Sequence, residues 1–212
     1  MNRTQLTRAL CIVTIVYAAA FYTVGGSVKP GYSHVSSFIS ELNATGTPWA
    51  STLGLVGFVP IALLLAAFLV AARPLVRVEG VSRAGFRLLW SQPLAFIGVV
   101  LAPCDAGCPV AGSSVQDLHN LIGLVTYFGA GLAIFLLSFA PILSADAAGA
   151  RVGLRIAGAA WLFLFILMLA PELAPLRGLL QRCADLILAA TLVCVAWRLV
   201  SGPTPRSMPV LQ

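Results

Sequence analysis

The chain carries very little charge. Charged residues make up only 9% of its 212 residues, whereas about 25% is usual in a soluble domain. Hydrophobic residues account for 59% of the chain, and its mean hydropathy is +0.97. This composition excludes a soluble globular protein and indicates an integral membrane protein. The length suits one compact bundle, so we predict a single transmembrane domain over residues 1–212.

Other features are also missing, and each absence argues against a class of function. The chain has no basic stripe with interleaved aromatic residues, so we expect no nucleic-acid partner. No second cysteine pair accompanies Cys104 and Cys108, so a structural zinc site is not indicated. No line of charged residues runs through the apolar segments, which ranks a pump or channel below other functions. Only two histidines occur, so histidine ligation could hold one haem at most.

Six apolar runs are long enough to cross a bilayer, which takes about 20 residues. They cover roughly residues 9–26, 52–72, 86–102, 118–143, 152–170 and 176–200. We therefore predict an all-α polytopic protein with a six-helix transmembrane bundle. The first run has the basic start and apolar middle of a signal peptide, and we take it as a retained span. Ser91, Gln92 and Pro93 interrupt the third run, where the proline should kink the helix.

The basic residues predict the orientation. Ten of them flank the runs on one side, namely Arg3, Arg8, Arg73, Arg77, Arg83, Arg87, Arg151, Arg155, Arg198 and Arg206. The three on the other side are Lys29, Arg177 and Arg182. Because basic loops stay in the cytoplasm, we predict a multi-pass protein of the plasma (inner) membrane with both termini cytoplasmic. The net charge of +6 then serves topology and contact with anionic lipid.

Groups capable of acid–base chemistry gather on the predicted outer side. Both histidines lie there, with the carboxylates of Glu41, Asp105, Asp117, Glu172 and Asp185. Only Glu79 and Asp146 lie on the inner side. Exposed loops are usually polar, which could account for any single residue. It accounts less well for inner loops that are so poor in these groups.

A polar stretch between the first two runs is the first candidate site. Helical periodicity over residues 33–42 places the apolar side chains on one side, and the serines, His34 and Glu41 on the other. We predict a short amphipathic helix that lies in the outer membrane interface or caps the bundle. Its candidate catalytic side chains are His34, Ser37, Ser40 and Glu41.

The loop of residues 103–109 contains Cys104 and Cys108. Cysteines that face an oxidising compartment pair, and Gly107 permits a tight turn between them. We therefore predict a Cys104–Cys108 disulfide. A metal site and a redox-active disulfide are weaker alternatives, because the spacing is not the two-residue spacing of thiol oxidoreductases.

A second polar group lies at the start of the fourth run. Ser114 and Asp117 have the spacing of a helix cap with a carboxylate three residues on. His119 and Asn120 follow, and His119 shares a helix face with Tyr127 that should point into the bundle or at its mouth. Asp117 and His119 are candidate catalytic residues and Asn120 is a candidate binding residue. The alternative for His119 is a core histidine that is hydrogen-bonded to a serine or a carbonyl.

The last run opens with Glu172 in a short turn, followed by Arg182 and Asp185 three residues apart. Arg182 and Asp185 can pair along one helix face, which would be a structural role. In the alternative, Arg182 reaches Glu41 or an anionic head group, since a guanidinium suits a carboxylate or phosphate. Arg182 is a candidate catalytic residue, and Glu172 and Asp185 are candidate binding residues.

Four motifs together resemble one family. They are residues 33–42, residues 103–109, the Leu-His-Asn of residues 118–120, and the stretch from Gly178 to Arg182. In this order they resemble the membrane-protein family catalogued as domain of unknown function 998, over most of the chain. Asn43 stands where that family usually has glycine. The resemblance implies a multi-helix prokaryotic membrane protein and no established activity.

Three classes of function stay open. The first is a lipid-directed hydrolase or transferase at the outer leaflet, with a serine nucleophile, a histidine base, and Glu41 or Asp117 to orient it. The second is a haem or metal binder built on the two histidines. The third is an accessory or structural subunit, or a lipid or small-solute binder. The expected partners are membrane lipid and a further membrane protein, no specific cofactor is indicated, and we place the enzyme narrowly first.

Overall fold

The computed structural model describes residues 1–143 and 147–200. Six helical segments in these ranges are long and apolar enough to cross a membrane: Arg3–Val28, Ala50–Ala72, Gly80–Leu101, Ser114–Leu137, Ala148–Met168 and Pro171–Leu199. Between the described residues the only β-type pairing is one isolated bridge from Val76 to Val200. The predicted all-α, six-span architecture is confirmed.

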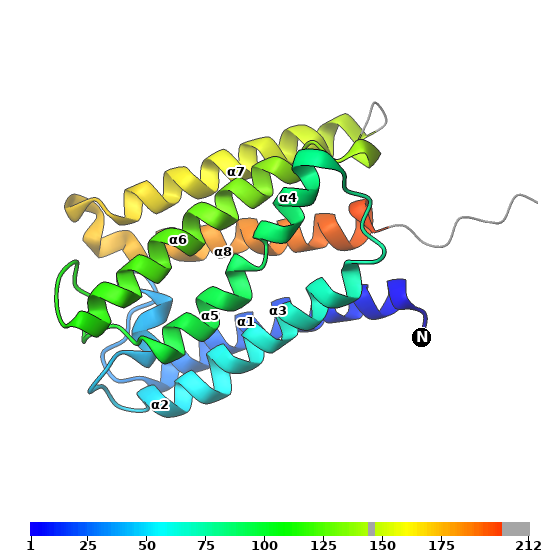
Figure 1. Ribbon diagram of the computed structural model, residues 1–212. Coiled ribbons are helices and arrows are strands. Elements are labelled where there is room, and N and C mark those ends of the chain that lie inside the picture. The colour runs from blue at the N-terminus through cyan, green and yellow to red at the C-terminus, as the bar shows by residue number, and fades with distance from the viewer. Residues whose placement is uncertain (144–146, 201–212) are drawn as a thin grey trace, which may run out of the picture.

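The helices lie side by side in one bundle (Figure 1). The α-helices are α1 (Arg3–Val28), α2 (Ala50–Leu53), α3 (Val59–Ala72), α4 (Gly80–Leu88), α5 (Ser91–Leu101), α6 (Ser114–Leu137), α7 (Ala148–Met168) and α8 (Arg177–Cys194). The 3-10 and π elements are η1 (Ile39–Asn43), η2 (Gly54–Phe58), η3 (Pro141–Leu143), η5 (Pro171–Leu176) and η6 (Val195–Leu199). The N-terminus and η6 lie at one end, called the terminal end (Figure 1). The opposite cap end holds η1, η5 and the α5–α6 loop.

The third span is two helices rather than one. α4 ends at Leu88 and α5 begins at Ser91, so the break falls just before the predicted interruption at residues 91–93. Pro93 lies in the first turn of α5, where a missing N–H costs little. On α4 the side chains of Arg83 and Arg87 are exposed, while Phe86 is buried. α4 is therefore an amphipathic helix at the terminal end of the bundle.

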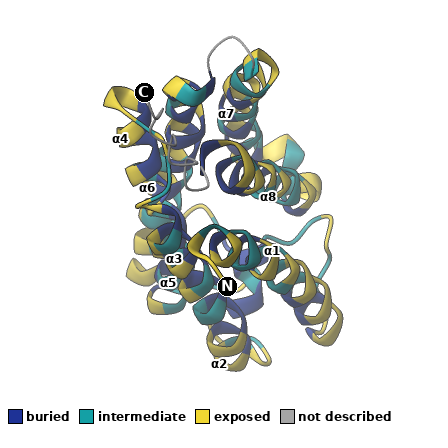
Figure 2. Ribbon diagram, turned by 90° about the vertical axis from the view of Figure 1, so that its right-hand side faces the viewer, coloured by how far each residue is buried: buried dark blue, intermediate teal, exposed yellow. Residues whose placement is uncertain are grey.

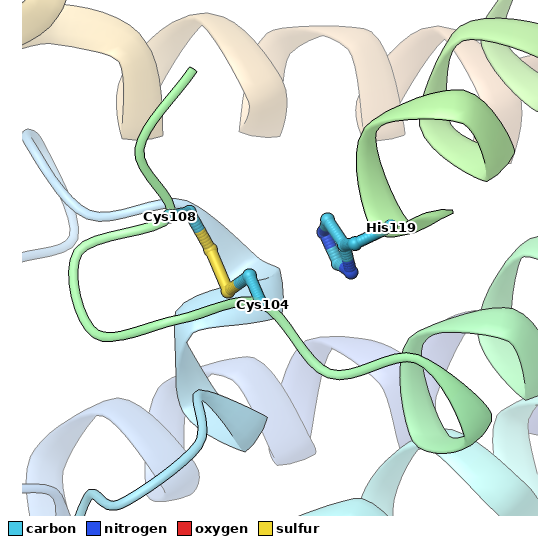
Figure 3. A group of neighbouring side chains, drawn as sticks. All are labelled: Cys104, Cys108 and His119. Atoms are coloured by element: carbon cyan, nitrogen blue, oxygen red, sulfur yellow. A yellow bond between two sulfur atoms is a disulfide. The ribbon is translucent and has the colours of Figure 1, made fainter. Parts of the chain in front are cut away.

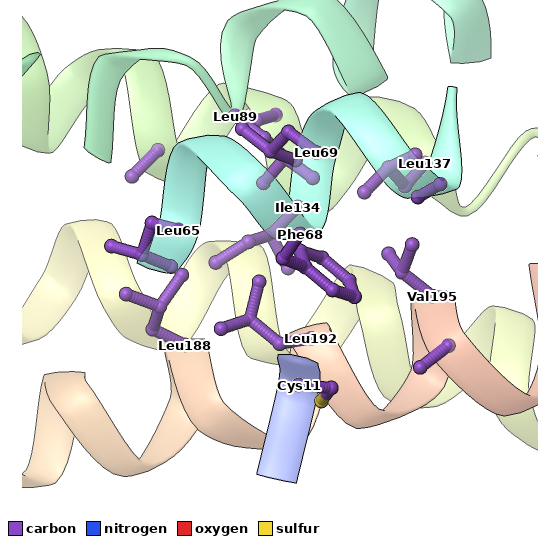
Figure 4. Packing of buried hydrophobic residues seen from close by; sticks show 14 of the residues in the cluster. Cys11, Leu65, Phe68, Leu69, Leu89, Ile134, Leu137, Leu188, Leu192 and Val195 are labelled. Atoms are coloured by element: carbon purple, nitrogen blue, oxygen red, sulfur yellow. The ribbon is translucent and has the colours of Figure 1, made fainter. Parts of the chain in front are cut away.

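Large apolar side chains fill the centre of the bundle. Phe68 is fully buried, and it packs with residues from α1, α3, α6, α8 and η6 (Figure 4). Viewed from the terminal end, the exposed residues face outward from the bundle and the buried ones face its interior (Figure 2). Because a bilayer would cover the outward apolar faces, they need no protein partner.

The segment of residues 32–43, here called the cap segment, differs from the prediction. It forms turns over residues 34–36 and the short 3-10 helix η1, so the expected continuous amphipathic helix over residues 33–42 is wrong. The Ser33 hydroxyl accepts from the N–H groups of Val35 and Ser36, 3.3 Å away in both cases. Such local side-chain bonds compete with the helical ladder.

Helix α8 forms hydrogen bonds with backbone groups of the cap segment. These groups would bond to one another if the segment were a continuous helix. The N–H of Leu179 donates to the carbonyl of Val35 at 2.9 Å. The N–H of Ile39 donates to the Gln181 side chain at 2.6 Å. Gly178 lies against the segment, where a Cβ would be 3.0 Å from the carbonyl oxygen of His34. The cap segment is thus shaped by its docking on α8 rather than by its own periodicity.

Candidate functional site

Arg177 fixes the cap segment to the bundle. Its Nη2 lies 3.1 Å from Oε1 of Glu41 in an ion pair, and it donates to the carbonyl of Gly107 at 2.7 Å. Its Nε donates to the carbonyl of Ser36 at 3.1 Å, and its guanidinium lies over the Phe38 ring, 4.6 Å from the centroid. Arg177 therefore joins α8, the cap segment and the disulfide loop. Arg177, and not Arg182, is the partner of Glu41, so the alternative in which Arg182 reaches Glu41 is wrong.

Lys29, which follows α1, also binds the cap segment. It is only 8% exposed, and its Nζ donates to the carbonyl of Leu42 at 3.1 Å and to the Thr47 hydroxyl. Burial lowers the pKa of Lys29, while the Glu41 carboxylate acts to raise it. This lysine therefore has a structural role at the cap end.

Arg182 holds a different set of partners. Its Nη2 donates to the Tyr32 hydroxyl at 2.6 Å and to Nδ1 of His34 at 3.1 Å. Its Nη1 donates to the carbonyls of Gly178 at 2.9 Å and Ser37 at 3.3 Å. Burial raises the pKa of Tyr32, although its hydrogen bond from Arg182 acts to lower it. The phenol is therefore neutral, and it accepts from Arg182 while it donates to the carbonyl of Phe38.

The tautomer of His34 follows from this contact. A guanidinium has donors and no acceptor, so Nδ1 of His34 accepts the hydrogen bond and the neutral ring carries its proton on Nε2. Within residues 1–143 and 147–200, no ion pair joins Arg182 to a carboxylate. The alternative in which Arg182 pairs with Asp185 is thus not found in this part of the chain. The Arg182 guanidinium is hydrogen-bonded but forms no ion pair there.

A groove of about 430 Å³ lies between α1 and α8. Its walls are mostly apolar, and its floor is formed by Ile61, Leu65 and Phe96. His34, Arg182 and Asp185 line it toward the cap end. Leu186 of α8, which is 71% exposed, also lines it. The groove therefore opens on the side of the bundle, where the bilayer would be.

A smaller polar chamber of about 90 Å³ lies inside the bundle. Its polar side chains come from the cap segment, α1, α5, α6 and α8: Tyr22, Ser40, Gln92, His119, Thr126, Tyr127, Gln181 and Asp185. His119 and Tyr127 both line it, so the predicted inward direction of that helix face is confirmed. Three residues line both spaces and therefore form the boundary between groove and chamber: Tyr22, Phe96 and Asp185.

The predicted disulfide is present between Cys104 and Cys108, with a Cα–Cα separation of 5.1 Å. The His119 ring points from the start of α6 toward this disulfide (Figure 3). Nδ1 of His119 lies 2.7 Å from the carbonyl oxygen of Ala102, so Nδ1 carries the proton and Nε2 is left as an acceptor. The Ser40 hydroxyl lies 3.4 Å from Sγ of Cys108.

Hydrogen bonds at the start of α6 involve other residues that the sequence analysis singled out. Ser113, rather than Ser114, caps α6: its hydroxyl accepts from the N–H of Gln116 at 3.2 Å and donates to Asp105 at 2.9 Å. Because Asp105 holds Ser113 through both its N–H and its hydroxyl, the cap begins one residue earlier than expected. Asn120 accepts from Gln116 at 2.8 Å and donates to the carbonyl of Val110 at 2.9 Å. Asn120 is therefore a loop-fixing residue.

The predicted site residues thus fall into separate groups. His34, Arg182 and Asp185 meet at the groove, and Ser40, His119 and Asp185 meet at the chamber. Glu41 and Ser37 lie in the docked cap segment. Asp117 and Glu172 are exposed, away from both spaces.

The arrangement offers no paired nucleophile and base among the described residues. The Ser37 hydroxyl accepts from the N–H of Ser33, and Ser40 contacts a disulfide sulfur. Neither space is lined by both histidines, so the geometry gives no support to a haem held between them. Cys104, Cys108 and His119 are close enough to hold an ion, but the two sulfurs are bonded to each other.

The family model described as protein of unknown function (DUF998) matches residues 12–198. The chain belongs to this family. The resemblance inferred from the four motifs is therefore confirmed over nearly all of the six-span bundle. No curated protein and no solved structure matches the chain. Family membership carries no activity, so function has to be argued from the site.

Sequence reasoning missed several residues that build the site. Arg177 was assigned only to the outer side, and no spacing rule links it to Glu41, which lies 136 residues earlier. Gln181 bonds both the cap segment and the Tyr127 hydroxyl, at 2.6 and 3.0 Å. A glutamine near a membrane-spanning segment could have signalled such a role, because polar side chains are costly there.

Proposed function

We propose that this protein binds a membrane phospholipid in the groove between α1 and α8. The observation that carries the proposal is the groove itself, an apolar space of about 430 Å³ that ends on His34 and Arg182. Apolar walls suit an acyl chain, and a cationic end suits a phosphate. The opening on the side of the bundle gives a lipid direct access from the bilayer.

The depth of the groove supports a lipid of one leaflet. On α8 its lining runs from Arg182 to Leu192, and on α1 from Thr23 to Thr14. Ten residues of helix rise about 15 Å, which is half of the ~30 Å hydrocarbon core of a bilayer. A lipid with its head group at Arg182 would therefore lie with its tail in the leaflet on the cap side.

The donors at the cap end of the groove suit a phosphate. Arg182 brings a positive charge that forms no ion pair with a carboxylate within the described ranges. His34 also lines the groove, and its Nε2–H is a second donor because Nδ1 is occupied by Arg182. Hydrogen bonds to a charged oxygen are stronger than neutral ones. Binding ranks ahead of hydrolysis because these residues supply donors and a cation but no paired nucleophile and base.

We also infer that the cap end faces outward from the cytoplasm in the plasma membrane. Apart from Arg177 and Arg182 of α8, the described arginines lie at the terminal end. Loops rich in arginine stay in the cytoplasm. The lipid would then be taken from the outer leaflet. A protein that binds lipid in this way could also act as an accessory subunit of another membrane protein.

The orientation can be tested at the α5–α6 loop. Val110 is 89% exposed there. We expect Val110→Cys in intact cells to react with a membrane-impermeant maleimide, because the loop faces the outside. Labelling that appears only after the inner membrane is opened would place the cap end in the cytoplasm.

The lipid proposal can be tested by filling the groove. Ala189 lines it, whereas the adjacent Ala190 is exposed and lies outside it. We expect Ala189→Trp to reduce phospholipid retained through purification by about tenfold, because the indole would occupy the acyl-chain space. Native mass spectrometry of the detergent-purified protein would count the bound lipid.

Ala190→Trp is the matched control. It adds the same side chain one position along α8 on an outward face, and we expect it to retain lipid at the wild-type level. Equal retention in the wild type and both variants would rule out the groove as the lipid site.

A further inference from the structure

Asp185 is the least satisfied polar group at the groove. Its Oδ2 is buried and has no hydrogen-bond partner among the described residues, although the Tyr22 hydroxyl lies close to the carboxyl. A buried carboxylate oxygen is costly to leave unpaired. Among the described residues Arg182 forms no ion pair with it, even though the two lie one turn apart on α8. Oδ2 of Asp185 therefore needs a hydrogen-bond donor, and the described residues do not supply one.

Two acceptors of the chamber beside Asp185 can take a further hydrogen bond. Nε2 of His119 is left as an acceptor because its Nδ1–H donates to Ala102. The Tyr127 hydroxyl oxygen accepts from Gln181 and has a further lone pair. Among the residues that the structure describes, no lysine or arginine lines the chamber. A small group that only donates hydrogen bonds and carries positive charge would complement this lining.

The boundary position of Asp185 connects this lining to the groove. The carboxyl lines both spaces, with Arg182 and His34 on the groove side and the acceptors on the chamber side. A ligand seated in the groove would thus meet the donors of Arg182 and His34 first and the carboxylate of Asp185 next. The charge of this end is balanced, with one arginine and one carboxylate, which suits a zwitterion better than a singly charged anion.

We propose that the bound lipid is a phospholipid whose head group ends in a primary ammonium. Its phosphate would lie at Arg182 and His34, and its ammonium would donate to Oδ2 of Asp185 at the entrance to the chamber. This inference rests on the proposed lipid binding and names the class of lipid. An ammonium has three donors and no acceptor, which matches the unpartnered oxygen and its neighbours.

The spacing of the two charges supports the assignment. Side chains three residues apart on a helix lie on one face, with Cβ atoms about 5–6 Å apart. The phosphate and ammonium of an ethanolamine head group are separated by only two methylene groups. Such a head group can therefore touch both side chains at once, whereas a glycerol head group has no cation to offer Asp185.

The selectivity of the wild-type protein tests this inference. The probes are dioleoyl phosphatidylethanolamine, phosphatidylglycerol and phosphatidylcholine, which differ only in head group, offered at equal concentration to delipidated full-length protein. We expect native mass spectrometry to show about tenfold preference for the ethanolamine lipid over both others. The other two lipids lose one charge-assisted hydrogen bond to Asp185, which accounts for this difference. The choline lipid is also a zwitterion, but its quaternary ammonium has no N–H and cannot donate a hydrogen bond from nitrogen.

Asp185→Asn tests the residue, since it keeps the shape and removes the charge. We expect the ethanolamine lipid to bind about tenfold more weakly to this variant, and the glycerol lipid to bind as it does to the wild type. Ala190→Trp should keep the wild-type preference. Equal binding of all three lipids to the wild type, or an unchanged preference in Asp185→Asn, would overturn the ammonium assignment while leaving lipid binding intact. Failure of every lipid to bind would instead contradict the proposed function.

Discussion

Arg182→Gln is expected to weaken phospholipid binding by about tenfold to a hundredfold. The guanidinium lines the groove and, among the described residues that line it, is the only arginine or lysine side chain. Glutamine can still bond to the Tyr32 hydroxyl but offers no charge to a phosphate. Arg182→Lys keeps the charge but loses the planar fork that holds Tyr32 and His34 at the cap end of the groove, so an intermediate affinity is expected. The measurement is the dissociation constant of a fluorescent phospholipid in detergent micelles.

Arg177→Gln is the matched control for that experiment. Arg177 lies on the same helix and binds the cap segment, but it lines neither space. We expect it to lower the melting temperature while phospholipid affinity stays within about twofold of the wild type, less than 0.5 kcal/mol. If Arg177→Gln weakened lipid binding as much as Arg182→Gln, the effect of Arg182 would be a consequence of cap stability rather than of contact with lipid.

Gly178→Ala is expected to destabilise the bundle by about 2–3 kcal/mol, as overpacking does. An added Cβ would overlap the carbonyl oxygen of Ser37 and lie 3.0 Å from that of His34. Both atoms belong to backbone and cannot rotate away, so the cap segment would have to move off α8. The melting temperature of the purified protein measures the effect.

Gly153→Ala serves as its control. Gly153 lies on α7, and an added Cβ there would have no neighbour within 4 Å. Because alanine is the better helix former, this variant should melt at the wild-type temperature or slightly above it. Equal melting of the two variants would show that close contact of α8 with the cap segment does not stabilise the fold.

The six spans could be predicted from the sequence because their signal is local. Apolar length alone identifies a membrane helix, and Pro93 marks the break between α4 and α5. The Cys104–Cys108 disulfide could be predicted for the same reason, because the pair is close in sequence. The inward face of α6 at His119 and Tyr127 followed from helical periodicity.

The cap segment and its contacts could not be predicted in this way. Its periodicity favoured a helix, but α8 takes the backbone groups of Val35 and Ile39, and no local rule anticipates a partner so far along the chain. The Glu41–Arg177 pair has the same origin. The groove depends on how far α1 and α8 diverge, and that distance is a property of packing rather than of either helix sequence.

Photo-crosslinking is the most direct test of a lipid in the groove. The probe is phosphatidylethanolamine with a diazirine midway along one acyl chain, incorporated in nanodiscs and mapped by mass spectrometry. If the groove holds the lipid, adducts should concentrate on its lining, at Ile15, Ala18, Leu188, Ala189 and Leu192. They should disappear from this set in Ala189→Trp. Labelling of the groove no greater than that of Leu63 and Val70, which are exposed on the outer face of α3, would contradict a lipid-binding groove.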